Sequence, residues 1–365
     1  MNAYLFYLFL IYGTFFLAKH ISSDRRVVIT LGRYPIIRNK NIRDIICTMF
    51  ISFPVILVLT NRFNVGTDFN NYLRMYNDYN SYGIYNYEWG ILAIFKLANI
   101  MGLEYKGVLF LFSFLGFGLA SQFIRLHSSG KEYSLSILFY LFLYFGPLCN
   151  IMAQTVAVSF LIVAYYGMKE RKTVLTIVSI VLATVFHTSS IIMIYIYCLY
   201  VFDRKNKFRF VSAIVLIFGI SVLISPSLLT KIIYIVGFRS YLKYLDYNSI
   251  RTFLYLLIYR APLYIVELLF KKSLIEKDTK NAFYYLLLLL EFICGAIGIR
   301  FSWIGRLMYS FSVTHVFLDA QIITMKENRN ERIALTLLII LYYTIAFWFI
   351  HFFSEFDGIM LFQIV

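Results

Sequence analysis

Residues 150–190 decide the fold of this chain. The segment begins NIMAQTVAVSF at Asn150, continues as an apolar run, turns at KERK (169–172) and ends TVLTIVSIVLATVFHTSS (173–190). Because the two apolar segments meet at the basic turn, their polar far ends lie on the opposite side of a membrane. These polar residues are Asn150, Gln154, His187, Ser189 and Ser190. Polar groups in hydrocarbon are costly and usually face a cavity or a partner. The segment therefore predicts a polar floor that is reached from one side of a bilayer.

The composition indicates a polytopic membrane protein. Of 365 residues, 61% are apolar, 19% aromatic and 15% charged, and the mean hydropathy is +0.74. A soluble domain contains about 25% charged residues. The first 18 residues lack a basic start and a small-residue cleavage site, so they predict an uncleaved span. The cysteines are predicted to be buried side chains, without disulfides or a metal site, because no CxxC spacing occurs among Cys47, Cys149, Cys198 and Cys294.

The distribution of basic residues orients the predicted spans. Apolar runs of spanning length lie near 1–18, 45–60, 107–124, 133–149, 151–168, 210–225, 252–270, 282–299, 307–325 and 333–351. Of the 34 Lys and Arg residues, 23 lie in the loops 19–44, 125–132, 169–172, 203–209, 271–280 and 326–332. Such loops are cytoplasmic by the positive-inside rule. The basic residues behind the net charge of +15 therefore orient the chain in the membrane, and we expect no nucleic-acid partner.

Two segments do not fit a simple series of spans. Residues 87–101 carry Glu88 and Lys96, and a crossing there would invert every later loop, so we predict an interfacial or re-entrant helix. Residues 173–202 must leave and return to the cytoplasmic side, which predicts a hairpin of two short helices. We therefore expect one all-α membrane domain over 1–365, with about twelve transmembrane helices, both termini outside and a long outer loop at 61–106.

That outer loop, which begins NRFNVGTDFNNYLRMYND at Asn61, is rich in Tyr, Asn and Asp. Its composition suits contacts with sugars, although it also suits an ordinary solvated loop. Gly66 precedes Thr67 and Asp68, so we predict a turn in which Asp68 caps the following helix.

Four motifs in order resemble the EpsG/Wzy family of polysaccharide repeat-unit polymerases. They are GTDFxxY (66–72), YEWG (87–90), NxxxQxxA (150–157) and AxxFHxS (183–189), with a weaker echo at Arg306 and Tyr309. The resemblance implies a GT-C-like, metal-independent glycosyltransferase without a cofactor, in the bacterial cytoplasmic (inner) membrane with its site facing outward. It would transfer a growing glycan from undecaprenyl diphosphate onto a lipid-linked repeat unit for O-antigen, capsule or exopolysaccharide. Membrane lipid and a chain-length regulator are further implied partners.

One position departs from the family's pattern. The residue before the glutamine is commonly arginine in the family, and this chain has Ala153 there. If that arginine binds the diphosphate, another basic residue replaces it here or activity is weaker, and Ala153→Arg would raise activity.

The chemistry of the reaction selects candidate residues. A diphosphate leaving group needs cations, and arginine binds phosphate with two hydrogen bonds. The candidate arginines are Arg62, Arg74, Arg239, Arg251, Arg300 and Arg306, with Arg260 deeper in its span. Arg260 can alternatively form a structural ion pair with Glu267 on the same helical face, and Arg300 and Arg306 can be ordinary flank anchors.

The acceptor hydroxyl needs a general base, for which His187, Asp68 and Glu88 are the candidates. The predicted substrate site is completed by Tyr72, Asn150, Gln154, Ser189 and Tyr309. His187 can also be a satisfied buried residue, and Glu291 and Asp319 are expected to hydrogen-bond neighbouring helices.

Three other classes of protein remain open from sequence. An O-antigen ligase would share the many spans and outer arginines, but the motif order favours a polymerase. A lipid-linked oligosaccharide flippase would show two-fold internal similarity and a cationic path, and neither is visible. A structural membrane component would leave the outward polar residues unexplained.

Overall fold

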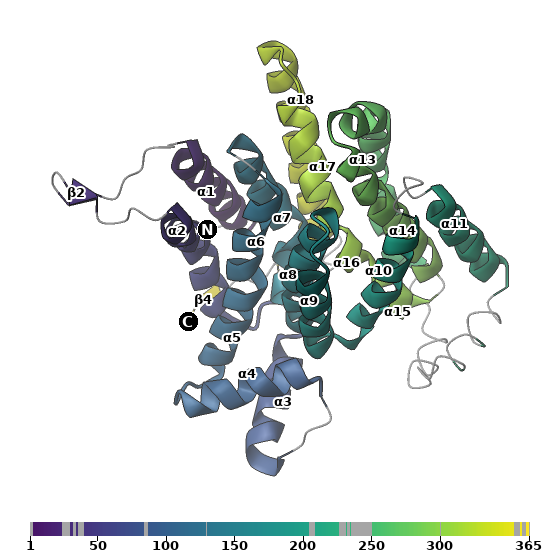
Figure 1. The fold of residues 1–365 in the computed structure, drawn as a ribbon. Coiled ribbons are helices and arrows are strands. Elements are labelled where there is room, and N and C mark those ends of the chain that lie inside the picture. The colour runs from purple at the N-terminus through teal and green to yellow at the C-terminus, as the bar shows by residue number, and fades with distance from the viewer. Residues whose placement is uncertain are drawn as a thin grey trace. The chain divides into compact units, whose positions relative to one another are not determined.

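The computed structural model describes residues 3–23, 30–31, 34–35, 40–83, 87–128, 130–203, 209–225, 231, 234, 250–299, 301–353, 358–359 and 363–364. The described chain is helical apart from two short antiparallel pairs of strands (Figure 1). One pair joins β1 (Thr30–Leu31) to β2 (Tyr34–Pro35), and the other joins β3 (Arg62–Phe63) to β4 (Gln363–Ile364). The predicted all-α class is confirmed.

Within the described residues, six helical segments are long and apolar enough to cross a membrane. They are Ala3–Ile21, Ile42–Thr60, Tyr105–His127, Lys131–Cys149, Thr279–Gly298 and Arg329–Phe353. Each overlaps an apolar run of the sequence, because backbone groups in hydrocarbon must bond within their own helix. Large apolar side chains remain exposed along these helices, including Phe9, Phe16, Phe50, Phe53, Leu337, Leu341 and Ile345. The chain is therefore a multi-pass membrane protein.

The chain forms two compact units. Unit 1 comprises residues 1–167, 173–188 and 323–365, and unit 2 comprises 168–172 and 189–322. Unit 1 contains α1 (Ala3–Ser23), α2 (Lys40–Thr60), α3 (Phe69–Tyr82), α4 (Trp89–Ile100), α5 (Tyr105–Ser113), α6 (Leu119–His127), α7 (Lys131–Cys149), α8 (Met152–Lys169), α9 (Thr173–Phe186) and α18 (Arg329–Trp348).

Helix α7 is the core of unit 1. Its span is 89% buried, and aromatic rings connect it to both ends of the chain. The Tyr7 ring on α1 lies 4.8 Å from the Phe145 ring, and Tyr343 on α18 stacks on Phe139 at 4.8 Å. Aromatic side chains bury large apolar areas, so these contacts fix α1 and α18 against α7.

A π-helical turn at Phe114–Gly118 separates α5 from α6 within one span. Such a turn releases carbonyl groups from the regular helical ladder. Hydroxyls from neighbouring helices bond two of its carbonyls: Tyr140 bonds Gly116 O at 3.1 Å, and Ser159 bonds Leu115 O at 2.9 Å.

Helices α3 and α4 form the cap of unit 1 at the ends of its longer helices. In Figure 1, α4 runs crosswise to α5 and α9, in the segment where the sequence predicts a helix. Close packing explains the glycine in YEWG, because a Cβ atom on Gly90 would lie 2.5 Å from the Phe186 ring. Trp89 and Ile100 remain exposed on the other face of α4.

Unit 2 is built around α14 (Ala282–Gly298). It also contains α10 (Ile192–Asp203), α11 (Arg209–Ile224), α13 (Ile250–Lys277), α15 (Ser302–Gly305), α16 (Met308–Phe311) and α17 (Val313–Thr324). The continuous span predicted at 307–325 is wrong in its first turn, since α16 is a separate single turn before α17. The break predicted in 173–202 is present, because a 3₁₀ turn at Thr188–Ile191 follows α9 and precedes α10.

Candidate functional site

The GTD turn (66–68) packs against the junction of α7 and α8. Asn150 occupies that junction, and its Oδ1 atom accepts hydrogen bonds from the Thr67 hydroxyl at 3.1 Å and the Asp68 backbone N–H at 3.4 Å. Gly66 has φ +97°, and a Cβ atom there would lie 2.7 Å from Cys149 O and 2.8 Å from Asn150 Oδ1. Two motifs separated by more than eighty residues therefore form one joint, with Asn150 as its positioning residue.

Tyr72 connects α3 to the start of α8. Its side chain is buried, and its hydroxyl accepts the Ala153 backbone N–H at 3.1 Å. The first N–H groups of a helix have no partner within the helix, so this contact caps α8. Ala153 and Gln154 are themselves buried, at 4% and 3% exposure, which leaves no open surface for an arginine side chain at position 153.

Arg62 is a buried arginine that binds the ends of two helices. Only 3% of the residue is exposed, and its guanidinium donates to Leu59 O near the end of α2 and, at 3.4 Å, to Cys149 O at the end of α7. Cations are favourable at helix C-termini because the unpaired carbonyls there carry partial negative charge. The same guanidinium has one nitrogen 2.8 Å from Met152 Sδ, next to Ala153. The Nε atom has no hydrogen-bond partner within the described part of the chain.

Glu88 and His187 form an ionisable pair in unit 1. Glu88 is the N-cap residue of α4, and His187 directly follows α9. The Glu88 Oε1 and His187 Nδ1 atoms are 3.8 Å apart, within ion-pair distance, and the two side chains are 34% and 21% exposed. Packing of Gly90 on Phe186 brings them together, so the YEWG and FHxS motifs meet as the GTD and Asn150 motifs do.

The remaining candidates between residues 61 and 106 are Asp68, which is half-buried, and Arg74, which is exposed. Asp68 occupies the N-cap position of α3 as predicted, but its side chain makes no cap hydrogen bond. Instead, Asp68 Oδ1 accepts from Asn71 Nδ2 at 3.1 Å, which corrects the predicted cap. Arg74 is exposed and donates to Asn71 Oδ1 at 3.3 Å. The exposed face of α3 carries Asn70, Asn71, Arg74, Asn77 and Asn80.

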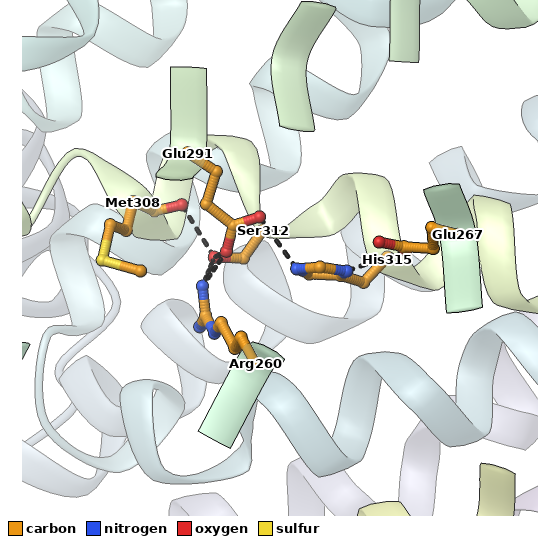
Figure 2. Close-up of polar contacts among 6 residues, drawn as sticks. All are labelled: Arg260, Glu267, Glu291, Met308, Ser312 and His315. Atoms are coloured by element: carbon orange, nitrogen blue, oxygen red, sulfur yellow. Dashed lines mark hydrogen bonds and ion pairs between the residues drawn. The ribbon is translucent and has the colours of Figure 1, made fainter. Parts of the chain in front are cut away.

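A buried ionic network connects three helices of unit 2. It begins at Arg260 on α13, whose Nη1 atom donates to Glu291 on α14 and to the Ser312 hydroxyl (Figure 2). His315 on α17 has its Nδ1 atom 2.8 Å from Glu267 Oε1 and its Nε2 atom 2.9 Å from Glu291 Oε2. The second of these contacts is within ion-pair distance but lacks hydrogen-bond geometry. The predicted Arg260–Glu267 pair is therefore wrong, because each residue binds a different helix.

The network decides the predicted roles of Glu291 and Arg260, and it includes His315, which the sequence did not predict. Glu291 contacts neighbouring helices as predicted, and Arg260 is buried against it rather than open to an outer substrate. His315, which is fully buried, was missed because a single histidine in an apolar run is uninformative. A usable signal exists in Arg260 and Glu267, since intramembrane charges on one helical face require partners.

Other candidates lie apart from these contacts. Arg306 is exposed between α15 and α16, and Tyr309 is half-buried on α16. Ser189 belongs to unit 2, and its buried hydroxyl has no hydrogen-bond partner within the described part of the chain. Arg239 and Arg300 and the side chain of Arg251 lie outside the described residues.

Comparison with known families matches most of the chain. A family model described as the EpsG family matches residues 44–364, a range that includes all four motifs. No curated protein sequence and no solved structure gives a significant match.

Proposed function

This chain belongs to the EpsG family, and we propose that it polymerises lipid-linked repeat units of a bacterial polysaccharide. In this proposal the growing glycan moves from undecaprenyl diphosphate to a new lipid-linked repeat unit at the outer face of the cytoplasmic membrane. The observation that carries it is the pairing of Glu88 with His187, which joins the second and the fourth of the four motifs at a partly exposed position.

The reaction requires a base for the acceptor hydroxyl. That hydroxyl oxygen attacks the anomeric carbon of the donor sugar, the bond from this carbon to the diphosphate oxygen breaks, and the diphosphate leaves with the bonding electrons. His187 takes the hydroxyl proton, because imidazole accepts protons near neutral pH. Glu88 faces Nδ1 of His187, so it orients the ring and stabilises the imidazolium that forms.

Charge and hydrogen bonding at the outer surface support the substrate class. Among the described candidate arginines, Arg74 in unit 1 and Arg306 in unit 2 are exposed, and we assign each to a diphosphate group of a lipid-linked substrate. The asparagine-rich face of α3 suits hydroxyl-rich sugars, because each amide offers donors and an acceptor. The proposed reaction is metal-independent, and the proposed fold has about twelve spans in a GT-C-like arrangement. Helix α4 would lie in the membrane interface, where its exposed Trp89 suits the headgroup region.

The test is polymer formation from lipid-linked repeat units by His187→Ala protein at matched membrane abundance. Loss of a general base lowers rates by roughly 10²–10⁴-fold, so long-chain product should fall by that factor. Glu88→Gln should lower the rate less, because the histidine remains. Normal polymer from His187→Ala at normal abundance would refute the assignment.

His127→Ala is the matched control. His127 is also a partly buried histidine of unit 1, and its Nε2 atom lies 2.8 Å from Ile162 O. We expect its loss to lower abundance without changing the rate per molecule. A deletion strain that retains single repeat units and loses long chains would distinguish polymerisation from transport of the lipid-linked precursor.

A further inference from the structure

The buried network of unit 2 ends on the short segment that carries Arg306. In the described chain between α14 and α17, residues 301–312 contain only the single turns α15 and α16, and Arg306 lies exposed between them. The Tyr309 N–H donates to Arg306 O at 3.3 Å, and the Ser312 N–H donates to Met308 O at 2.8 Å. A hydrogen-bonded turn therefore connects exposed Arg306 to buried Ser312.

Ser312 ties this turn to a carboxylate. Its hydroxyl oxygen lies 2.8 Å from Glu291 Oε1 and 2.7 Å from Met308 O, and it also accepts from Arg260 (Figure 2). The hydroxyl has one hydrogen, so it donates to one of the two acceptors at a time. When the hydroxyl donates to Glu291 Oε1, it bonds the end of α16 directly to that carboxylate. When it donates to Met308 O, the link to Glu291 passes through Arg260, which donates to both Ser312 and Glu291.

Glu291 is itself fixed from two other helices. Arg260 from α13 binds Oε1, and His315 from α17 faces Oε2. The other ring nitrogen of His315, Nδ1, lies 2.8 Å from Glu267 Oε1, so His315 lies between the two carboxylates. Arg260, Glu267, Glu291 and His315 are at most 5% exposed, and such a buried group of charges holds its geometry because separating any pair is costly. The network is thus a rigid support for residues 301–312, which contact it through Ser312.

We propose that Glu291 and Ser312 are positioning residues that hold Arg306 toward the diphosphate of the lipid-linked substrate. The inference rests on the proposed function, since the diphosphate is the anionic group of that substrate. Arginine binds phosphate through a planar fork that requires orientation, so an anchor on the segment's backbone acts on binding. Substrate affinity is therefore expected to depend on a hydroxyl that lies in the protein interior.

The first experiment measures the position of the segment without using activity. Arg306→Cys is made in a Cys198→Ser background, because Cys198 is exposed, which corrects its predicted burial, whereas Cys47, Cys149 and Cys294 are buried as predicted. A membrane-impermeant maleimide is added to intact cells, and the labelling rate is compared with and without Ser312→Ala. Because Ser312→Ala removes one hydrogen bond, we expect the labelling rate at position 306 to change by about fivefold.

Thr314→Val is the matched control for this labelling. Thr314 is fully buried, and its hydroxyl has no hydrogen-bond partner within the described part of the chain. The substitution therefore removes a neighbouring buried hydroxyl without touching the network, and the labelling rate should not change. An unchanged rate with Ser312→Ala, or no labelling at position 306 at all, overturns the positioning role.

The second experiment uses the intact Arg306 chain and measures transfer kinetics. Ser312→Ala should raise KM for the lipid-linked repeat unit by about fivefold with kcat nearly unchanged, and Ser312→Thr should restore KM.

A fall in abundance with unaltered KM overturns the proposal in favour of a purely structural network. Unaltered KM in Arg306→Ala also overturns it, while long-chain product in that variant upholds the polymerase. Absence of polymer from the unsubstituted chain refutes the polymerase, and the labelling result still decides the positioning role.

Discussion

At the scale of single residues, the family motifs act largely on one another. Asn150, Tyr72 and Arg62 were expected to bind substrate, yet each has protein partners: the GTD turn, the start of α8 and the ends of α2 and α7. Arg62 lies beside Met152, next to Ala153. It is thus a basic group close to the position where the resemblance implies an arginine.

The first prediction compares Gly66 and Gly102, two of the described glycines that have a positive φ. Gly102 has φ +64° and nothing within 4 Å of an added Cβ atom, whereas Gly66 meets Cys149 O and Asn150 Oδ1. Gly102→Ala should therefore cost only the backbone strain of about 1 kcal/mol. Gly66→Ala adds the overpacking cost of about 1–3 kcal/mol. Thermal unfolding in detergent measures both, and equal losses of stability would contradict the crowded joint.

The second prediction separates two arginines of the outer segment. Arg62→Ala removes a buried cation from two helix ends, so membrane abundance should fall, with a cost of about 1–3 kcal/mol. Arg74→Ala affects an exposed side chain, so abundance should stay normal while polymer formation falls. Immunoblots of membranes beside polymer gels measure the two effects. The opposite pattern would exchange the roles of the two residues.

At the scale of elements, helix positions were predictable and helix partners were not. Apolar runs and basic loops predict the spans, because burying a backbone in lipid requires a helix of fixed length. The pairing of Arg260 with Glu291 instead of Glu267 depends on which helices become neighbours. The separation of α16 from α17 is equally local in effect and distant in cause, since Phe311, Ser312 and Val313 contain no helix-breaking residue.

The third prediction tests charge balance between α13 and α14. Glu291→Gln leaves the Arg260 cation buried without its carboxylate, and breaking a buried pair costs about 3–5 kcal/mol. The double variant Arg260→Met with Glu291→Gln removes both charges and should recover much of the lost abundance. Detergent stability of the single and double variants measures the coupling. Additive losses would show that charge balance is unimportant here.

At the scale of the whole molecule, the distribution of basic loops predicts an orientation, which is tested with two engineered cysteines. In a Cys198→Ser background, Asn70→Cys lies on the exposed face of α3 and Lys172→Cys lies on the exposed basic turn. Because the basic turn is predicted to be cytoplasmic, an impermeant maleimide should label position 70 in intact cells and position 172 only after permeabilisation. Labelling of position 172 from outside would invert the topology and remove the outward site.

The π-helical turn at Phe114–Gly118 has a genetic consequence. A π turn accommodates one more residue than an α-helix of the same rise, so the span from α5 to α6 contains a stored insertion. Deleting one codon there should let α5 and α6 continue as a regular helix, at the expense of the bonds from Tyr140 and Ser159. The same deletion inside α7 would rotate all following side chains by about 100°. Single-codon deletions should therefore be tolerated at Phe114–Gly118. They should not be tolerated in the middle of α7.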